Sequence, residues 1–509
     1  MEALFAQVNA VLAFVGPVSD FFWDFPTNIP FYHDLPLIGN FSLAVLVLLG
    51  AGLFFTVRTG FIQVTNFKKG ILTLTEKTST SKGISPLAAF LLSSAMRVGP
   101  GNIIGVTGAI SVGGPGALFW MWVSATFGMA TAYAEAVLSQ IFKEKSKDEF
   151  VGGLPFYGYR LAGNSAAVGF FLSIMYIVYA MCCIPAQGFN VVSAVNQMYG
   201  MMIGTEVDPT STFSIVTAIV VVLCTGWIAF GGIRGIVRVT NKLVPVMAIV
   251  YLLLVLMLII LNLDQLPFFF TAVFSQAFSP EAAFGGAFGT VLVQGVKRGL
   301  MSNEAGQGTI TMAAACADAK HPCEQGCVQA IGVFLDTLVI CTLTGFVVIM
   351  AHLWTTPESA AWFELGKLPR FLTSAAALTP GETLSVIVPF LIAFCFCLFA
   401  LTCLIGMISF SEIAAHRISD KTSFINAIRL LGIFITAFGI SCSLAGIDLG
   451  NLWAISDLGN ILIVFANVPL LCLGAPYVLR ATKHYKANDD TPFTSETIGY
   501  QGKLWWDEK

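Results

Sequence analysis

Charged residues are scarce in this sequence. Asp, Glu, Lys and Arg make up 11% of its 509 residues, whereas an ordinary soluble domain contains about 25%. So few charges cannot cover the surface of several soluble domains, which excludes the usual architecture for a chain of this length. The sequence also has no long basic run, and its net charge is −3. This balance excludes a nucleic-acid-binding protein.

Residues that bind metals or build disulfide frameworks are few or badly placed. The five histidines are scattered without the spacing of metal ligands, so no resident metal is expected. Most of the 12 cysteines lie inside apolar runs, and we expect small buried side chains rather than disulfides. There is no H-E-x-x-H motif, no pair of catalytic carboxylates and no nucleophile elbow. An enzyme is therefore not expected.

Long apolar runs make up most of the chain, which is 56% hydrophobic with 48 Gly and 43 Phe. A helix needs about 20 apolar residues to cross a bilayer. The predicted spans are residues 40–58, 84–113, 116–142, 166–199, 211–230, 243–263, 284–314, 326–352, 384–412, 425–445 and 452–479. We therefore predict an all-α polytopic membrane protein with about 11 transmembrane helices. Residues 61–82 are too polar to span the bilayer and predict an amphipathic segment on its surface.

The distribution of basic residues predicts the orientation. No Lys or Arg precedes Arg58, whereas the next loop contains a cluster of them, and the signs then alternate from loop to loop. Because cytoplasmic loops carry the excess of Lys and Arg, we expect residues 1–39 to be an extracytoplasmic N-terminal segment. Residues 61–82 and the tail 480–509 are then cytoplasmic. The loop 353–383 is the one basic loop expected outside.

Two of the predicted spans contain residues that interrupt a helix. The span 84–113 contains RVGPGN at 97–102, and the span 284–314 contains GLMSNEAGQG at 299–308. In a helix interior, Gly costs about 1 kcal/mol and Pro about 3 kcal/mol. Backbone groups freed by such breaks cannot face lipid, so they must line a cavity or meet a ligand.

The two breaks are five spans apart, which divides the chain into two halves, residues 84–263 and 284–479. An odd number of spans in each half inverts the second relative to the first, and matching interrupted helices indicate a transporter with its substrate site at the midplane. Two packing kinks, or a sensor that binds without moving its ligand, are the alternatives. A nucleotide-binding loop at Gly99-x-Gly101 is excluded because the next glycine is Gly105.

Four stretches resemble a known family, the alanine or glycine:cation symporters, also called sodium:alanine symporters. They are RVGPGNIIGV (97–106), GGPGALFWMW (113–122), GGIRGIVRVTNKLVPVMA (231–248) and GVKRGLMSNEAGQG (295–308). The resemblance extends from about Thr56 to Tyr477. It implies a LeuT-type 5+5 inverted repeat with one extra N-terminal helix, here 40–58. It also implies Na⁺-coupled import of a small neutral amino acid through the cytoplasmic membrane of a prokaryote.

The resemblance also implies a set of substrate-binding residues. They are Arg97, Gly101, Gln187, Met301, Ser302, Asn303 and Glu304. Gln187 stands out from the residues alone, because it is polar and follows Pro185 inside an apolar helix. Other roles stay open: a hydrogen bond between helices for Gln187, an ion pair with Lys297 or Arg298 for Glu304, and a cap for Asn303.

The coupling ion is expected to be Na⁺, held by oxygen atoms of Val98, Gly101 and Thr402. The sequence departs from the family at three places: Pro100 replaces a usual Thr, Met301 replaces a usual Phe, and Cys403 replaces a second hydroxyl residue. A thiol is a poor Na⁺ ligand, so coupling to protons through Glu304 is the alternative. No other cofactor is expected.

Overall fold

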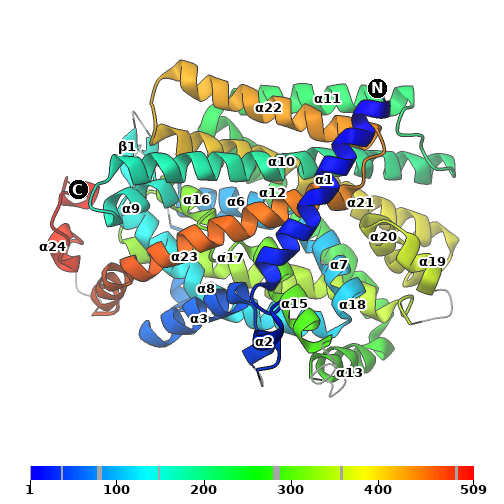
Figure 1. The fold of residues 1–509 in the computed structure, drawn as a ribbon, viewed down its shortest axis with the longest axis horizontal. Helices are drawn as coiled ribbons and strands as arrows, with labels where there is room; N and C mark the ends of the chain where they lie inside the picture. The colour runs from blue at the N-terminus through cyan, green and yellow to red at the C-terminus, as the bar shows by residue number, and fades with distance from the viewer. Residues whose placement is uncertain are drawn as a thin grey trace.

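The computed structural model describes residues 2–35, 38–76, 83–146, 149–278, 287–355, 359–487 and 491–508. Within these ranges the chain is mostly helical, as predicted, and the named strands form one antiparallel hairpin, β1 (Glu144–Ser146) and β2 (Glu149–Val151). Figure 1 shows the helices side by side in one bundle.

The helices follow the predicted spans closely. Those of the first half of the chain are α3 (Leu43–Arg58), α6 (Pro86–Arg97), α7 (Ile104–Gly113), α8 (Gly116–Ile141), α10 (Ala166–Ile203), α11 (Thr212–Ala229) and α12 (Gly232–Leu261). Those of the second half are α15 (Ala287–Asn303), α16 (Ile310–Cys316), α17 (Pro322–Val333), α18 (Thr342–Met350), α21 (Glu382–His416), α22 (Thr422–Leu444) and α23 (Leu449–Ala487). Shorter helices between them are α9 (Leu154–Leu161), α13 (Leu266–Ala277), α19 (Ser359–Glu364) and α20 (Lys367–Ala377).

Seven of the described helices are long and apolar enough to cross a bilayer, and a bent pair makes eight. The bent pair is α6 with residues 100–113, which meet at 59°. The predicted spans 40–58, 116–142 and 284–314 coincide with α3, α8 and the pair α15–α16, which do not meet the same criterion. Helix length and hydropathy therefore give eight spans in the described residues, where the sequence predicts eleven.

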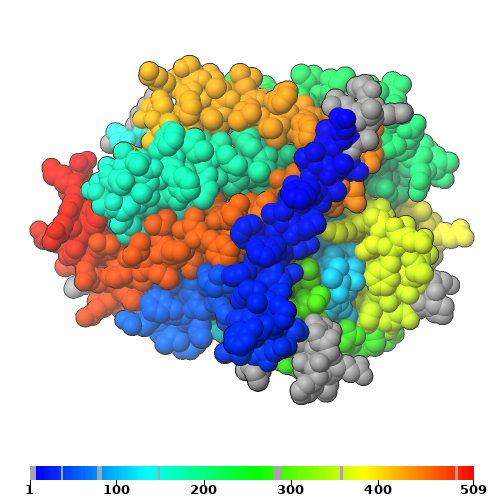
Figure 2. Space-filling model, viewed as in Figure 1, coloured from blue at the N-terminus to red at the C-terminus, as the bar shows by residue number. Residues whose placement is uncertain are grey.

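The segment before the first predicted span contains helices of its own. The helix α1 (Glu2–Asp24) crosses obliquely over α23 on the face shown in Figures 1 and 2. Near its end, Trp23 Nε1 donates to the carbonyl oxygen of Asp457 in α23 at 3.0 Å. A short helix, α2 (Pro30–His33), follows before α3.

The predicted surface segment 61–82 is also partly helical, although residues 77–82 lie outside the described residues. It contains α4 (Ile62–Thr65) and α5 (Phe67–Leu74). Lys68 and Lys69 are exposed, whereas Gly70 and Thr73 are buried. The segment therefore has one polar and one buried face, and its buried face packs on α17.

The chain after α23 folds back onto the bundle as α24 (Ser495–Ile498) and a 3₁₀ turn, Trp505–Glu508. Trp506 Nε1 donates to the carbonyl oxygen of Gln140 in α8 at 2.7 Å. The ammonium of Lys143, just after α8, lies 4.3 to 4.9 Å from the ring centres of Phe150, Trp505 and Trp506. These residues form an aromatic cage around Lys143.

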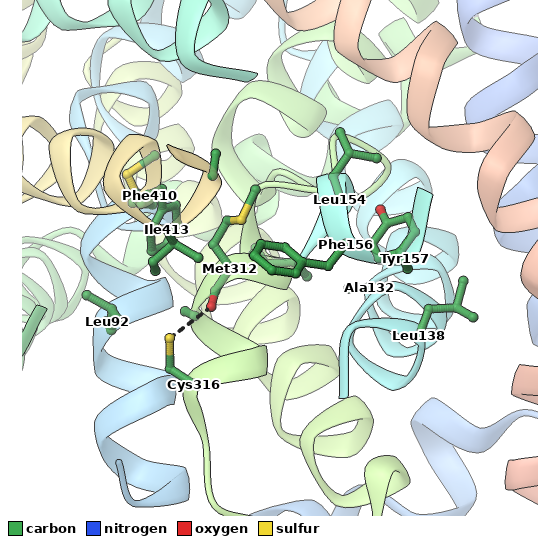
Figure 3. Packing of buried hydrophobic residues seen from close by; sticks show 14 of the residues in the cluster. Leu92, Ala132, Leu138, Leu154, Phe156, Tyr157, Met312, Cys316, Phe410 and Ile413 are labelled. Carbon is green, nitrogen blue, oxygen red and sulfur yellow. Dashed lines mark hydrogen bonds between the residues drawn. The ribbon is translucent and has the colours of Figure 1, made fainter. Parts of the chain in front are cut away.

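The short helices next to the breaks are buried by the long ones. Figure 3 shows Met312 and Cys316 of α16 among Leu92 of α6, Phe156 of α9 and Phe410 of α21. Cys316 Sγ donates to the carbonyl oxygen of Met312 at 3.3 Å within α16. This packing fixes the half-helices, so the residues between them have defined positions.

Candidate functional site

The first break lies between α6 and α7. The N-cap of helix α6 is Ser85, whose Oγ accepts from the amide of Ala88 at 3.1 Å. It ends at Arg97, because Pro100 has no N–H to donate to the preceding turn. Residues Pro100–Asn102 form a 3₁₀ turn, and Asn102 Oδ1 accepts from the amide of Gly99 at 2.8 Å. The side chain of Asn102 thus replaces a helical hydrogen bond.

The second break lies between α15 and α16, where the backbone turns left-handed three times. Glu304 has φ of +60°, Gly306 of +98° and Gly308 of +75°. A left-handed conformation is common for glycine but rare for glutamate. Glu304 therefore occupies a strained position inside a buried break, and such positions are typical of functional sites.

A buried carboxylate from α8 holds this second break open. Glu135 Oε1 accepts from the amides of Gly306 at 3.0 Å and Gly308 at 2.8 Å. Asn467 Nδ2 of α23 donates to the same oxygen at 2.6 Å and to the carbonyl of Gly306 at 2.9 Å. Tyr157 in turn donates to Asn467 Oδ1. These contacts satisfy backbone groups that a broken helix leaves without partners.

Arg97 joins the two breaks. Its Nε donates to the carbonyl oxygen of Asn303 at 3.1 Å, and its Nη1 donates to Gln329 Oε1 in α17 at 2.9 Å. Its Nη2 is buried and has no partner among the described residues. The guanidinium lies against Gly332, where an added Cβ would meet Nη1 at 1.9 Å. One donor of a buried cation thus remains available for a ligand.

A second buried carboxylate, Asp336, lies in a π-helical turn between α17 and α18, Phe334–Cys341. Its Oδ1 accepts from Asn102 Nδ2 at 2.6 Å, and its Oδ2 accepts from Ser302 Oγ at 2.7 Å and Thr337 Oγ1 at 2.8 Å. The salt bridges formed by described residues do not include Asp336, so its hydrogen-bond partners are neutral. Asn102 and Ser302 come from the two breaks, which therefore meet at this carboxylate.

A cavity of about 30 Å³ lies between the breaks. Five of the residues predicted from the sequence line it: Arg97, Gly101, Gln187, Met301 and Glu304. Sulfur-containing side chains form another part of its wall: Met96, Cys183, Cys403 and Met407. One face of α23 completes it: Trp453, Ser456 and Asn460. The structure thus brings together residues more than 300 positions apart in the sequence.

Four predicted residues lie outside the cavity lining. Ser302 belongs to the Asp336 cluster, and Asn303 donates from Nδ2 to Thr337 Oγ1 at 3.1 Å. Val98 is buried within the first break. Thr402 Oγ1 donates to the carbonyls of Leu398 and Phe399 in its own helix. Its neighbour Cys403 reaches the cavity instead, with Sγ 3.7 Å from the carbonyl oxygen of Met96.

The alternative roles named for three residues can be compared with the contacts. Lys297 and Arg298 pair with Asp457 at 2.9 and 3.1 Å rather than with Glu304, whose Oε2 accepts from Thr309 at 2.7 Å. Asn303 Oδ1 accepts from the amide of Ala305 at 3.0 Å, which is a capping contact. Gln187 Oε1 is buried without a hydrogen bond to any described residue.

Several residues of the site were not selected from the sequence. Glu135, Asp336 and Asn467 each lie inside a predicted span, at 116–142, 326–352 and 452–479. An ionisable residue inside a membrane span is itself a sign of function, and that rule would have found Glu135 and Asp336. Asn467 carries no comparable signal, because its role depends on contacts between remote helices.

Comparison with known proteins gives a consistent result. The family model described as the sodium:alanine symporter family matches residues 34–497. The amino-acid carrier protein AlsT of Bacillus subtilis is 34% identical over 471 residues, which is 91% of this chain and 95% of that protein. The sodium/alanine symporter AgcS of Methanococcus maripaludis is 32% identical, covering 87% of this chain and 93% of its own length.

A solved structure shows the fold independently of these sequences. MhsT, whose crystal structure was solved in complex with L-phenylalanine, superposes with a TM-score of 0.57 at 16% identity. The match covers 80% of this chain and 93% of MhsT. The two chains therefore share their overall fold.

Proposed function

The chain belongs to the sodium:alanine symporter family, and from this membership we propose that it imports a small neutral amino acid together with Na⁺. It is a multi-pass membrane transporter rather than an enzyme. In the proposal, the cavity between the two breaks is the substrate site. It opens alternately to the two sides of a prokaryotic cytoplasmic membrane.

The observation that carries the proposal is the pair of opposite charges lining one buried cavity. Arg97 is 1% exposed and Glu304 is 4% exposed, and both line the cavity. Both residues are described, and no ion pair joins them. An amino acid is a zwitterion, so its carboxylate matches the free Nη2 of Arg97 and its ammonium matches Glu304 and Gln187 Oε1. A neutral or singly charged ligand would leave one buried charge without a partner.

The small size of the cavity supports a small substrate. Its volume of about 30 Å³ is far below the few hundred Å³ of a drug-sized pocket. Around Gly101, an added Cβ would lie 3.6 Å from the carbonyl oxygen of Met301, which is ordinary contact. A larger side chain at this position would fill the space between the breaks.

Two sets of oxygen atoms are candidates for the Na⁺ site. The set proposed from the sequence consists of the carbonyls of Val98 and Gly101 and the hydroxyl of Thr402. The Thr402 hydroxyl can coordinate Na⁺ through an oxygen lone pair while it still donates its hydrogen bond to the carbonyl of Leu398 or Phe399. The second set is the Asp336 carboxylate with the hydroxyl of Ser302. An uncompensated buried carboxylate is costly, and a bound cation removes that cost. We propose that Na⁺ binds at one or both of these sets. The variants Asp336→Asn and Thr402→Val distinguish the two.

The proposed topology follows from the same family membership. Residues 84–263 and 284–479 form two inverted five-helix halves, each with one interrupted helix, and 40–58 is the extra helix. The N-terminal segment 1–39 is outside, and the tail 480–509 is cytoplasmic. The shared fold with MhsT and the similar breaks of α6–α7 and α15–α16 support this arrangement.

Uptake of labelled alanine and glycine into proteoliposomes tests the proposal. We expect accumulation driven by an inward Na⁺ gradient at constant pH. Asp336→Asn should raise the Na⁺ concentration for half-maximal uptake if the second set binds the ion, and Thr402→Val should do so if the first does. Cys403→Ser adds an oxygen beside the Met96 carbonyl and should preserve or strengthen apparent Na⁺ affinity.

The proton-coupled alternative predicts a different result in the same experiment. Uptake would ignore Na⁺, follow an inward pH gradient and disappear in Glu304→Gln. Absence of uptake for every small neutral amino acid under both gradients would contradict the proposed function itself.

A further inference from the structure

One face of α23 places three polar side chains in the wall of the cavity. Trp453, Ser456 and Asn460 are three and four residues apart, so they lie on the same side of the helix. All three are buried and line the cavity. The rest of the wall outside the breaks and α10 is formed largely by thioether and thiol groups of α6 and α21.

These polar groups have hydrogen-bonding capacity that the protein does not use. Trp453 Nε1 is buried and has no partner among the described residues. The side-chain amide of Asn460 makes no hydrogen bond to any described residue. Ser456 Oγ makes long contacts of 3.4 and 3.5 Å to the carbonyls of Leu452 and Cys182. A buried polar group without a partner is destabilising, so a ligand in the cavity is its natural partner.

The charged ends of an amino acid do not need these groups. In the proposed function, the carboxylate is met by Arg97 and the ammonium by Glu304 and Gln187. Those residues come from the breaks and from α10, not from α23. The face of α23 is therefore left to meet the side chain of the substrate.

We propose that Trp453, Ser456 and Asn460 form a side-chain subsite that selects small neutral amino acids carrying a hydroxyl or a carboxamide. This inference rests on the proposed function and specifies its substrate class. Trp453 Nε1 donates to the oxygen of the substrate side chain, and the Asn460 amide donates to and accepts from it. An aliphatic side chain of the same size leaves these groups without partners, and a site of this kind rejects such an analogue.

The experiment uses isosteric pairs of competitors against labelled L-alanine uptake in proteoliposomes containing the full chain. L-Serine is compared with L-2-aminobutyrate, and L-asparagine with L-leucine, because each pair differs mainly in hydrogen bonding. We expect the polar member of at least one pair to inhibit at a concentration at least tenfold lower in the wild type. In Asn460→Leu the two members of each pair should differ by less than about threefold.

Asn451→Leu is the matched control, because Asn451 lies on the same helix but donates to Asn9 Oδ1 at 2.7 Å, outside the cavity. It should keep the wild-type preference. Trp453→Phe keeps the ring, removes the N–H and should also reduce the preference, which guards against misfolding of Asn460→Leu.

Equal inhibition within both pairs in the wild type, with alanine uptake intact, would overturn the subsite and leave the proposed function standing. A wild-type preference that persists in both Asn460→Leu and Trp453→Phe would equally overturn it. Loss of all amino-acid uptake in the wild type would instead contradict the proposed function.

Discussion

Gln187 shows how one side chain can be tested without disturbing the fold. It lies in the middle of α10, two residues after Pro185, and its buried Oε1 has no partner among the described residues. If that oxygen accepts from the substrate ammonium, Gln187→Ala should raise the KM for uptake about tenfold, because a hydrogen bond to a charged group contributes about 1.5–3 kcal/mol.

The measurement is initial-rate uptake with equal amounts of reconstituted protein. Asn190→Ala is the control, since Asn190 is also buried on α10 but is not part of the cavity wall. A wild-type KM in Gln187→Ala would remove Gln187 from the binding site and leave it a structural role between helices.

Gly332 controls the position of Arg97 without reaching the cavity itself. A Cβ at this position would meet Nη1 at 1.9 Å and Cζ at 2.9 Å, so the guanidinium must move away from Asn303 and Gln329. We expect Gly332→Ala to raise the KM at least tenfold while the protein still folds, because only the end of a side chain is displaced.

Gly105→Ala is the matched control for this change. Gly105 lies in α7 next to the first break, and an added Cβ there meets nothing within 4 Å. Uptake by Gly105→Ala should equal that of the wild type. Equal KM values for the two variants and the wild type would show that the orientation of Arg97 does not matter for transport.

At the scale of helices, α10 and α22 pack closely where Gly439 of α22 faces Pro185 of α10. A Cβ on Gly439 of α22 would meet the carbonyl oxygen of Pro185 at 2.2 Å and its Cα at 2.4 Å. These are backbone atoms and cannot move aside as a side chain can. Close packing of membrane helices commonly depends on such small residues.

We therefore expect Gly439→Ala to lower the free energy of unfolding by about 1–3 kcal/mol, the usual cost of overpacking. Thermal unfolding in detergent measures the change. Gly226→Ala in α11 is the control, because its Cβ would lie 3.5 Å from Ile433 Cδ1 and alanine is favoured over glycine in a helix by about 0.5–1 kcal/mol. Similar unfolding temperatures for both variants would contradict the close approach.

Other helices of the bundle show what the sequence can and cannot predict. The breaks after Arg97 and Asn303 were predicted because Pro100 and the glycines act on their own backbone. The helices α1 and α2 were not predicted, since residues 1–39 were assigned only a side of the membrane. The π-helical turn at Asp336 was not predicted either. The partners of Asp336 are remote in the sequence, with Ser302 34 residues away and Asn102 234 residues away. Local chemistry can be read from the chain, but contacts between remote helices cannot.

On the scale of the whole molecule, the C-terminal segment reaches two half-helices through Lys143. They are α6, which precedes the first break, and α16, which follows the second. Lys143 Nζ, inside the aromatic cage, donates to the carbonyl oxygen of Ala317 at 2.8 Å. Ala317 follows α16 and forms a parallel bridge with Ile84, just before α6. The tail thus supports the ends of α6 and α16 together.

We expect Trp506→Ala to destabilise the protein by about 3–5 kcal/mol, as truncation of a buried aromatic side chain does. It should also make the tail a faster target in limited proteolysis. Trp227→Ala is the control, because Trp227 is 82% exposed. Unchanged unfolding and digestion in Trp506→Ala would show that the tail contributes little to the bundle.

The thiols in the cavity wall have a practical consequence for following transport. Cys183 and Cys403 are buried and line the cavity, whereas Cys224 and Cys472 are exposed on the outside of the bundle. After alkylation of the exposed pair with a lipid-soluble maleimide, a small water-soluble thiol reagent can reach Cys403 only while the cavity is open to one side. The chain therefore carries native chemical reporters of its own gating, whose labelling rate should fall when substrate protects them.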